Sequence, residues 1–598
     1  MTMSAADMLY SDMVACYRIM ESTTKRGELT DALVSLFKRT PKNIVDKVTY
    51  LNQGKLYPDY MGVEIGVGEK MAMKAISLAS GIEQSKVEEA YRRLGDLGSA
   101  AEEVLSKRVQ TSLLSGHLTV VQVYDTLDRI ARTSGGGSLD ARLSLLAGLL
   151  VNANPEEAKY IVRTAIGKLR LGVADYTALD ALAIAFTGDK SKRVELERAY
   201  NLCSDLGLVA ATVAREGFEG LKSFKVQAGR PIRPMLAERL STSSEIIEKM
   251  GGVCSAEYKF DGERMQIHKM EREVVIFSRR LEQITSNYPD AVELAKSAIK
   301  ASTAILECEA VAVDKDSGDL LPFQQLMHRR RKYGIKEAME SIPISLFFFD
   351  VLMVDGEDMT RMKYSERRRV LESVVAAGER VQLAPARRVR SPVVLERYME
   401  EAIQAGCEGL MVKALDGVYQ AGSRGFLWIK LKREYRSELT DTLDLVVVGG
   451  FHGKGRRTGV YGALLLAVYN EEEDVFESVT KVGTGFTDED LSRLYALLQD
   501  AIIPHRSPRV KSKMEADVWF TPKLVVEVIA SEITLSPIHV AGWGSVRKDS
   551  GLALRFPKFT GKVRDDKSPE DATTTKELVE MYKMQLKKID EKPELTQT

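Results

Sequence analysis

One short stretch of the chain combines a lysine, carboxylates and an arginine at a spacing that could support phosphoryl transfer. It reads Glu257-Tyr258-Lys259-Phe260-Asp261-Gly262-Glu263-Arg264 and comes after Gly251-Gly252 at the start of an expected strand. A lysine amine can act as a nucleophile and form a covalent intermediate. Lys-x-Asp-Gly alone is a weak motif, because Asp-Gly is a common turn dipeptide and an exposed turn explains it equally well. The chemical interpretation therefore depends on residues further along the chain.

Two pairs of charged residues come next in order, each within or beside an apolar run. Glu307 and Glu309 alternate, so their side chains share one face of a strand, and Lys430 and Lys432 do the same. Carboxylates can hold Mg²⁺ through one or two contacts, and lysines neutralise phosphate charge in a transition state. Each pair by itself could equally be a solvated strand face or a set of snorkelling surface charges. In order after Lys259, they predict covalent phosphoryl chemistry with a divalent metal.

Composition restricts the class of protein. The 598 residues contain 85 Lys+Arg and 85 Asp+Glu, so a nucleic-acid-binding surface would need its positive charge gathered locally. The five cysteines are far apart, which argues against a disulfide framework or a zinc module and fits a reducing compartment. No apolar run approaches the length of a membrane span, and the N-terminus lacks a signal-peptide pattern. We expect a cytoplasmic monomer without membrane association.

Three regions differ in their hydrophobic period. Residues 1–222 have the three- and four-residue spacing of helices, and Arg170-Leu171-Gly172 and Asp205-Leu206-Gly207 are each expected to close a helix at a glycine. Phosphates bound at the next helix starts are the alternative for these glycines. Residues 223–432 mix strand-like and helical runs after a linker rich in proline and glycine, which indicates an α+β domain. Residues 433–598 indicate a small β-barrel and a terminal helix.

Short apolar or alternating runs mark the expected strands. In the middle region they cover 273–277, 304–313, 344–354, 409–412 and 426–431, with helices expected at 291–299 and 365–375. In the last region they cover 445–448, 463–468, 477–482 and 524–529, separated by glycine-rich turns, and a helix is expected from 574 to 589. The reactive-type residues thus adjoin strands of the middle region.

The ordered series resembles the nucleotidyltransferase motifs of ATP-dependent DNA ligases of the archaeal and eukaryotic replicative type, over nearly the whole chain. The motif-like runs are Glu257–Arg264, Phe277–Arg280, Phe347–Asp350, Glu408–Lys413, Trp428–Lys432, Arg555–Phe559 and Arg564–Lys567. Leu169–Gly172 and the linker Pro231–Ala237 are also similar to the family. One departure is Cys308, which stands between two acidic residues where the family usually has a glycine, although Glu309 keeps the key carboxylate.

The resemblance implies three domains and an activity. The domains would be an all-α DNA-binding domain at 1–222, an α+β adenylation (nucleotidyltransferase) domain at 223–432, and an OB-fold β-barrel with a C-terminal helix at 433–598. The activity would be the sealing of single-strand nicks in duplex DNA through a lysyl-AMP enzyme and a DNA-adenylate, in replication, repair and recombination. ATP would be the nucleotide and Mg²⁺ the metal, with Mn²⁺ as the alternative.

The resemblance also implies residue roles. Lys259 would carry AMP, Glu257 would lie near the adenine amino group, and Phe349 would stack on the base. Metal would be held by Glu309 and Glu408. The remaining nucleotide contacts would come from Arg264, Arg279, Glu309, Arg424, Lys430, Lys432 and Arg555. Since Arg555 belongs to another domain than Lys259, the barrel would have to close over the nucleotide by a hinge near residues 432–435.

DNA and a sliding clamp are the implied partners. DNA contacts would include Arg170, Gly172, Lys454 and Arg456, and would reach mainly phosphates. Basic clusters at 107–108, 328–332, 454–457 and 511–513 could touch DNA or be solvated faces. Gln110-Thr111-Ser112-Leu113-Leu114 resembles a weak clamp-docking motif, in which Leu113 and Leu114 replace aromatic residues; a helix-capping loop is the alternative.

Other functions share parts of this pattern. RNA ligases and mRNA capping enzymes have the lysine motif, but the long helical region and the Arg555–Phe559 ending favour DNA ligation. An NAD-dependent ligase is disfavoured because no set of cysteines could form that family's zinc module. A non-catalytic DNA-binding or clamp scaffold would not need the motif residues intact. The sequence favours ATP, but the residues expected to contact the base do not exclude ADP or GTP.

Overall fold

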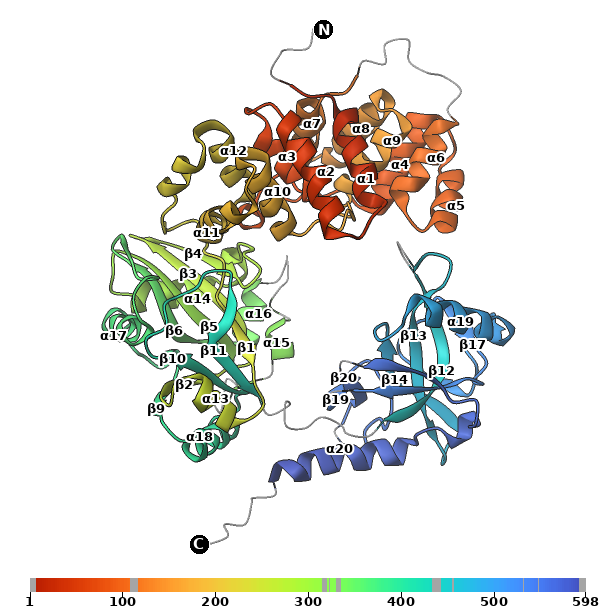
Figure 1. Cartoon of the computed structure of the whole chain (residues 1–598). Coiled ribbons are helices and arrows are strands. Elements are labelled where there is room, and N and C mark those ends of the chain that lie inside the picture. Colours follow the sequence, from red (N-terminus) through yellow and green to blue (C-terminus); the bar gives the residue numbers. More distant parts are fainter. Residues whose placement is uncertain are drawn as a thin grey trace. The chain divides into compact units, whose positions relative to one another are not determined.

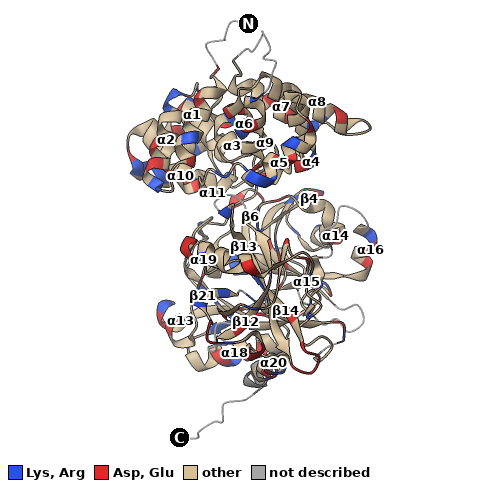
Figure 2. Ribbon diagram, turned by 90° about the vertical axis from the view of Figure 1, so that its right-hand side faces the viewer, with Lys and Arg blue, Asp and Glu red and all other residues tan. Residues whose placement is uncertain are grey.

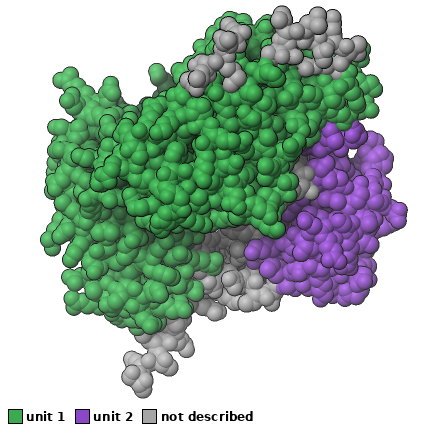
Figure 3. Space-filling model, turned by 45° about the horizontal axis from the view of Figure 1, so that its top comes forward, with its two compact units in different colours: residues 1–91, 97–432 green, residues 92–96, 433–598 purple. Residues whose placement is uncertain are grey.

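The structure is a computed structural model that describes residues 7–107, 117–313, 320–321, 323–327, 329, 335–432, 442–453, 457–530, 532–546, 548–555 and 557–590. Contacts between residues divide the chain into two compact units, which Figure 3 colours separately. The first unit comprises residues 1–91 and 97–432, and the second comprises residues 92–96 and 433–598. In the part of the chain that the structure describes, no helix is long and apolar enough to cross a membrane.

The N-terminal part of the first unit is helical, as its periodicity predicts (Figure 1). Side chains define several helix starts: Thr119 and Asn154 each form a capping box that satisfies otherwise unpaired N–H groups. Both signs of charge are interspersed along these helices (Figure 2). The helices are α1 (Tyr10–Glu21), α2 (Arg26–Arg39), α3 (Val45–Asn52), α4 (Glu69–Ser80), α5 (Gln84–Leu94), α6 (Leu97–Ser106), α7 (Val120–Arg132), α8 (Ser138–Asn152), α9 (Pro155–Ala165), α10 (Asp175–Thr187), α11 (Arg193–Cys203) and α12 (Leu206–Glu216).

The helix end expected at Arg170-Leu171-Gly172 is wrong. Helix α9 ends earlier, at Ala165, and Gly167 beyond it takes the left-handed conformation with φ +67°. Arg170 is exposed and has φ +56°, an uncommon value for a residue with a side chain. The segment is therefore a loop that leads into α10, with Arg170 presented at its surface.

The helix end expected at Asp205-Leu206-Gly207 is also wrong. Helix α11 ends at Cys203, and Asp205 begins the next helix by accepting a hydrogen bond from the N–H of Leu208. Gly207 thus lies in the first turn of α12, where a Cβ atom would approach the Tyr50 ring to 2.3 Å. The glycine permits close packing against α3 and does not terminate a helix.

The described residues of the rest of the first unit include two β-sheets, and the expected strands are confirmed to within two residues at each end. The five-stranded sheet has the order β1-β11-β10-β2-β9, and the six-stranded sheet has the order β4-β3-β5-β6-β7, with β8 beside β6. The strands are β1 (Leu236–Arg239), β2 (Cys254–Lys259), β3 (Glu263–Met270), β4 (Glu273–Ser278), β5 (Thr303–Ala312), β6 (Ile344–Val354), β7 (Glu357–Asp358), β8 (Val381–Leu383), β9 (Ala386–Val389), β10 (Gly409–Ala414) and β11 (Arg424–Lys432).

Helices cover the outer faces of these sheets and complete two apolar cores. One core packs the six-stranded sheet against α14 (Pro289–Ala298) and α17 (Tyr364–Val374). The other packs the five-stranded sheet against α13 (Ser243–Lys249) and α18 (Pro392–Gln404). Cys308 is buried in the first core within β5, at a point where the pairing of β5 with β6 shifts register between Glu307 and Cys308.

The linker before β1 is tied to the six-stranded sheet by two buried polar residues of β3. The N–H of Gly229 donates to Nδ1 of His268 at 3.0 Å, and the N–H of Ile232 donates to Oε1 of Gln266 at 2.8 Å. Since Nδ1 accepts, Nε2 carries the proton and donates to Oε1 of Gln266 at 2.9 Å. The amide of Gln266 returns a hydrogen bond to the carbonyl of Ile232 at 3.0 Å. The linker therefore has a defined path into β1.

The described residues of the second unit contain an eight-stranded sheet and the two helices named below. Its strands have the order β15-β17-β12-β13-β14-β16, with β18 paired to β12 and β21, and a separate pair β19-β20. The expected strands and terminal helix are confirmed here, with the helix at α20 (Thr575–Asp590) and another at α19 (Asp488–Leu498). The strands are β12 (Leu443–His452), β13 (Tyr461–Asn470), β14 (Val475–Val482), β15 (Ile502–Ile503), β16 (Val510–Lys511), β17 (Val518–Phe520), β18 (Val525–Ile529), β19 (Glu532–Ser536), β20 (Gly551–Arg555) and β21 (Lys558–Val563).

Replacing His268 with asparagine should weaken the loss of stability in acid. Burial lowers the pKa of His268 to about 3, whereas an unfolded chain titrates near pH ~6.5. Because the unfolded chain binds the proton first, the stability contributed by neutral His268 is present above pH ~6.5 and is lost as the pH falls below it. The asparagine of His268→Asn keeps an acceptor for the N–H of Gly229 but cannot titrate. The free energy of unfolding of the variant should therefore change less with pH than that of the wild type, by up to about 1.4 kcal/mol per pH unit.

The measurement is the free energy of unfolding of both proteins in urea at several values between pH 7.5 and pH 4.5. The cavity left by the smaller side chain lowers stability at every pH, so the slope and not the absolute value is compared. If the free energy of unfolding changed equally with pH in the two proteins, the lowered pKa of His268 in the folded protein would be contradicted.

Candidate active site

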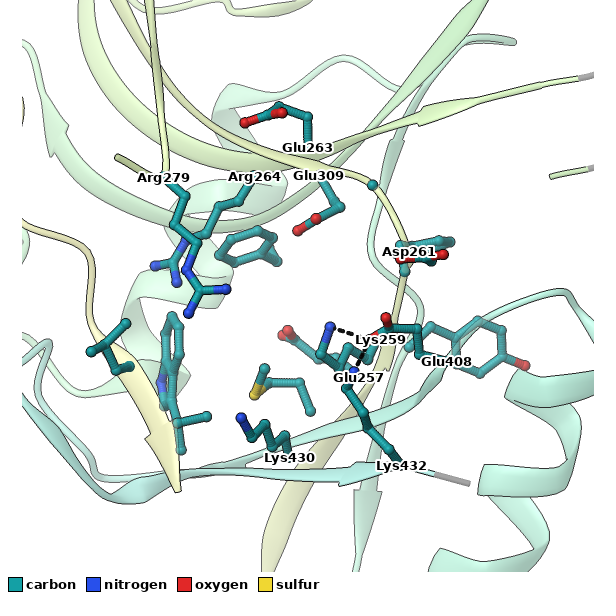
Figure 4. Close-up of a pocket in the computed structure, with 18 of the residues that line it drawn as sticks. Glu257, Lys259, Asp261, Glu263, Arg264, Arg279, Glu309, Glu408, Lys430 and Lys432 are labelled. Carbon is teal, nitrogen blue, oxygen red and sulfur yellow. Dashed lines mark ion pairs between the residues drawn. The ribbon is translucent and has the colours of Figure 1, made fainter. Parts of the chain in front are cut away.

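A pocket of about 490 Å³ lies in the first unit and is lined by strands of both sheets (Figure 4). Every residue that the sequence predicts in this unit as a nucleotide or metal contact lines it. These residues are Glu257, Lys259, Arg264, Arg279, Glu309, Phe349, Glu408, Arg424, Lys430 and Lys432. Residues separated by more than a hundred positions in sequence are therefore brought into one cavity by the pairing of strands.

Adjacent strands β2, β10 and β11 bring the central lysines together. Gly409 of β10 is the register partner of Lys259 on one side and of Lys432 on the other. The backbone of Gly409 has φ +146°, and a Cβ atom there would come within 2.2 Å of the carbonyl oxygen of Leu431. Only glycine fits this close approach. The side chain of the preceding residue, Glu408, is consequently placed between the two lysines.

Glu408 forms the ion pairs at the centre of the pocket. Its Oε2 lies 2.6 Å from Nζ of Lys259 and 2.9 Å from Nζ of Lys432. Burial alone would raise the pKa of Glu408, but the two adjacent ammonium groups lower it to about 2. Glu408 is therefore an ionised carboxylate at neutral pH, held against the ammonium of Lys259.

Glu309 has the opposite environment. It points into the same pocket from β5 (Figure 4), and burial raises its pKa to about 7, although Lys259 and Arg264 partly oppose the shift. Across the pocket, burial and the neighbouring cations Lys432 and Arg424 lower the pKa of Lys430. Among the carboxylates that line the pocket, Glu408 is thus firmly ionised and Glu309 protonates easily, and the lysines and arginines of the lining give an excess of positive charge that an anionic ligand would relieve.

Glu307 does not lie on a solvated strand face. Only 1% of its surface is exposed, and both of its carboxylate oxygens accept hydrogen bonds from Nη2 of Arg264, at 2.9 and 2.8 Å. Arg264 also donates to the carbonyl of Met235 at 2.9 Å and lies over the rings of Phe349 and Trp428. Glu307 therefore orients Arg264, which itself lines the pocket.

Sequence reasoning missed the role of Lys413, which belongs to a motif-like run but was assigned no contact. The side chain of Lys413 is fully buried, and its Nζ lies 2.6 Å from Oε2 of Glu257 and donates to the carbonyl of Phe349 at 2.9 Å. Trp428 also lines the pocket, with its ring 6.2 Å from that of Phe349. Residues alternate between the two faces of β10, so Lys413 shares a face with Met411, which also lines the pocket. This alternation in the sequence could have identified Lys413 as a pocket residue.

The donors present fit a small divalent cation bound together with phosphate. Among the described residues, no group of three or more His, Cys, Asp or Glu could hold a metal ion by itself. Glu309 and Glu408 nevertheless both project into the pocket beside Lys259 (Figure 4). Mg²⁺ keeps several waters and is usually bound by one or two carboxylates plus substrate phosphates. This donor set suits Mg²⁺ in the presence of a nucleotide.

The remaining predicted residues are dispersed. Arg170 and Gly172 lie in the loop between α9 and α10, and Gly172 has φ +69°. Arg555 ends β20 in the second unit, where it is exposed. Lys454 and Arg456 fall outside the described residues, as do the clamp-motif residues Gln110, Leu113 and Leu114. The hinge expected near residues 432–435 also continues outside them beyond Lys432.

Comparison with known proteins gives consistent matches along the chain. Residues 9–183 match the DNA ligase N terminus, residues 234–432 the ATP dependent DNA ligase domain, and residues 457–567 the ATP dependent DNA ligase C terminal region. The DNA ligase of Cenarchaeum symbiosum is 52% identical over 97% of this chain and 99% of its own length. DNA ligase 2 of Thermofilum pendens is 51% identical over 98% of this chain and 99% of its own length.

A solved structure named Pmar-Lig_PreS3 supports the fold alone. It has a TM-score of 0.53 and 17% identity, and the match covers 92% of this chain and 98% of that chain. The sequence matches support the assignment to a family, because two relatives about half identical to this chain span almost all of it. The chain belongs to the family of ATP-dependent DNA ligases, enzymes that seal nicks in duplex DNA.

Proposed function

We propose that this ligase carries AMP on Lys259. The observation that supports this role most directly is the position of its Nζ, inside the pocket and 2.6 Å from Oε2 of Glu408. A lysine surrounded by cations and carboxylates in a pocket of nucleotide size is suited to attack a phosphate. Lys430 and Lys432 line the same cavity, where they would neutralise charge on the α-phosphate.

The chemistry would proceed in three transfers. The ammonium of Lys259 loses one proton to solvent, Nζ forms a bond to the α-phosphorus of ATP as the bond to pyrophosphate breaks, and the nitrogen releases a second proton to leave a phosphoramide. The 5′-phosphate oxygen at a nick then forms a bond to the phosphorus of AMP as the bond to Nζ breaks, and the lysine takes up two protons to become an ammonium again. Finally, the neighbouring 3′-hydroxyl attacks the activated phosphate, loses its proton and displaces AMP. Each transfer exchanges one bond at phosphorus for another.

Mg²⁺ would be bound by Glu309 and Glu408 together with the phosphates, with Mn²⁺ as the alternative. The ion would supply charge neutralisation at the phosphates. Glu408 can take part because Lys259 and Lys432 keep it ionised. Arg264, oriented by Glu307, would contact the ribose or the nick phosphate, and Arg279 and Arg424 would add positive charge at the mouth of the pocket.

The wider organisation follows from the same family assignment. We propose a DNA-binding domain at 1–222, an adenylation domain at 223–432 and an OB-fold domain at 433–598, which would contribute Arg555 when it closes over the nucleotide. The protein would act as a cytoplasmic monomer on nicked duplex DNA and dock on a sliding clamp. Arg170 and Gly172 would contact DNA, because the left-handed backbone of Arg170 presents its exposed side chain from a loop. Lys454 and Arg456 would add phosphate contacts.

Replacing Lys259 with alanine should abolish covalent labelling by nucleotide. The wild-type protein is incubated with α-labelled ATP, GTP or NAD and examined by denaturing electrophoresis, and label is expected from ATP. The variant should retain the sealing of nicks that already carry a 5′-adenylate, because that step uses no lysyl-AMP. Label that persists in the variant would place the nucleophile elsewhere. Absence of label from every nucleotide in the wild type would favour a non-catalytic scaffold.

Replacing Glu309 with glutamine should raise the Mg²⁺ concentration needed for half-maximal labelling of Lys259 by about tenfold or more. The amide keeps the shape of the side chain but removes the charge that attracts the cation. The matched control is Glu293→Gln, because Glu293 is exposed on α14 and is paired on the surface with Lys296 at 2.9 Å. Superimposable Mg²⁺ titrations for wild type and Glu309→Gln would exclude Glu309 as a ligand.

Replacing Arg170 with alanine should weaken binding of nicked duplex without changing labelling by ATP. The affinity of the wild type should fall steeply with salt, and loss of one phosphate contact should reduce the slope of log affinity against log salt by about one. Arg170→Lys retains the charge and serves as the control. Binding by fluorescence anisotropy that is unchanged in Arg170→Ala at all salt concentrations would remove Arg170 from the DNA interface.

A further inference from the structure

The inner wall of the pocket contains a buried carboxylate whose partners come from two directions. Glu257 is 1% exposed, and its Oε2 is paired with the buried Nζ of Lys413 at 2.6 Å. Its other oxygen, Oε1, accepts a hydrogen bond from the hydroxyl of Tyr364 and lies 3.5 Å from Nη1 of Arg368. Lys413 is on β10, whereas Tyr364 and Arg368 are one helical turn apart on α17.

Tyr364 and Arg368 are themselves held firmly, so they can fix the carboxylate in one position. Tyr364 is 2% exposed and begins α17, where its N–H donates to the carbonyl of Gly417 at 2.8 Å. Arg368 donates to the carbonyl of Ala384 at 3.1 Å. Neither residue lines the pocket, and neither belongs to the motif-like runs that carry the resemblance. Any effect of these two residues on a ligand is therefore indirect, through Glu257 or through Lys413, whose Nζ lies 5.0 Å from the centroid of the Tyr364 ring.

This arrangement fixes the hydrogen-bonding character of Glu257 toward the pocket. Two cations and a hydroxyl group surround the carboxylate, and an ionised carboxylate can accept hydrogen bonds but cannot donate them. A purine with an amino group at C6 presents a donor to it, whereas a purine with an oxo group at C6 presents an acceptor. When two acceptors face each other in a buried site, neither forms a hydrogen bond. The energetic cost of these unpaired groups is the strongest basis for rejecting a close analogue.

We propose that Tyr364, supported by Arg368, is a positioning residue that makes this ligase select a 6-aminopurine nucleotide over a 6-oxopurine nucleotide. The proposal rests on the nucleotide pocket assigned above, and it concerns the choice of base and not the transfer chemistry. Tyr364 acts by holding Oε1 of Glu257, while Lys413 holds Oε2, so the carboxylate keeps one orientation in the pocket that Glu257 and Phe349 both line.

The test uses the full-length protein with Tyr364 replaced by phenylalanine, which keeps the ring in the core and removes only the hydroxyl. Labelling of Lys259 is followed as a single turnover over a range of concentrations of ATP and of inosine triphosphate, which carries an oxo group at C6. We expect the ratio of kcat/KM for ATP to that for inosine triphosphate to fall about tenfold, mainly through a higher KM for ATP.

Two further variants separate positioning from general structural damage. Tyr288→Phe removes a hydroxyl from another fully buried tyrosine of the same unit, whose ring packs against Arg329, and should leave the ratio unchanged. Arg368→Gln should lower the ratio in the same direction as Tyr364→Phe, and Arg368→Lys should restore most of it. If Tyr364→Phe does not fold, the two Arg368 variants decide the question.

An unchanged ratio in Tyr364→Phe and Arg368→Gln would overturn the proposal. An equal fall in kcat/KM for both nucleotides would overturn it too, because that result means a structural role without base selection. Failure of the proposed function looks different: the wild type would then take no label at Lys259 from any nucleotide, whatever residue stands at position 364.

Discussion

The active-site geometry depends on one close backbone approach, at Gly409 between β2 and β11. Strand β10 can pair with both neighbours at this point only because no side chain separates Gly409 from the carbonyl of Leu431. The same pairing makes Lys259 and Lys432 neighbours across β10 and inserts Glu408 between them. A glycine thus determines where Lys259, Glu408 and Lys432 meet. The chemistry is positioned by sheet register and not by a flexible loop.

Two carboxylates in this pocket differ because their neighbours differ. Glu408 touches two ammonium groups and its pKa is lowered to about 2, whereas Glu309 is dominated by burial and its pKa is raised to about 7. Pairs of titratable groups with pKa values driven apart by their environments are characteristic of catalytic sites. The surrounding excess of lysine and arginine is the complementary feature, because it makes the cavity favourable for an anionic ligand.

Most strands could be predicted from the local pattern of apolar and polar residues in the sequence. The run at 344–354 is β6 to the residue, and the strand containing Glu307 and Glu309 is continuous despite Cys308. The ends of the helices could not be predicted in this way. Gly207 was expected to end a helix, but it lies within α12 because the Tyr50 ring packs against it from a segment more than a hundred residues away. Periodicity carries no information about such a partner.

The sequence by itself determined the family and the ordered set of charged and aromatic residues, because those depend on residue type and spacing, and it predicts Lys259 as the nucleophile. Only the tertiary structure decided which of them are buried and which touch. Glu307 and Lys413 both sit on alternating strand faces in the sequence, yet each is buried and paired, Glu307 with Arg264 and Lys413 with Glu257. Alternation along a strand identifies a face, but the strands and helices that cover that face come from distant parts of the chain. Burial and charge pairing, and therefore pKa values and selectivity, are properties of that packing.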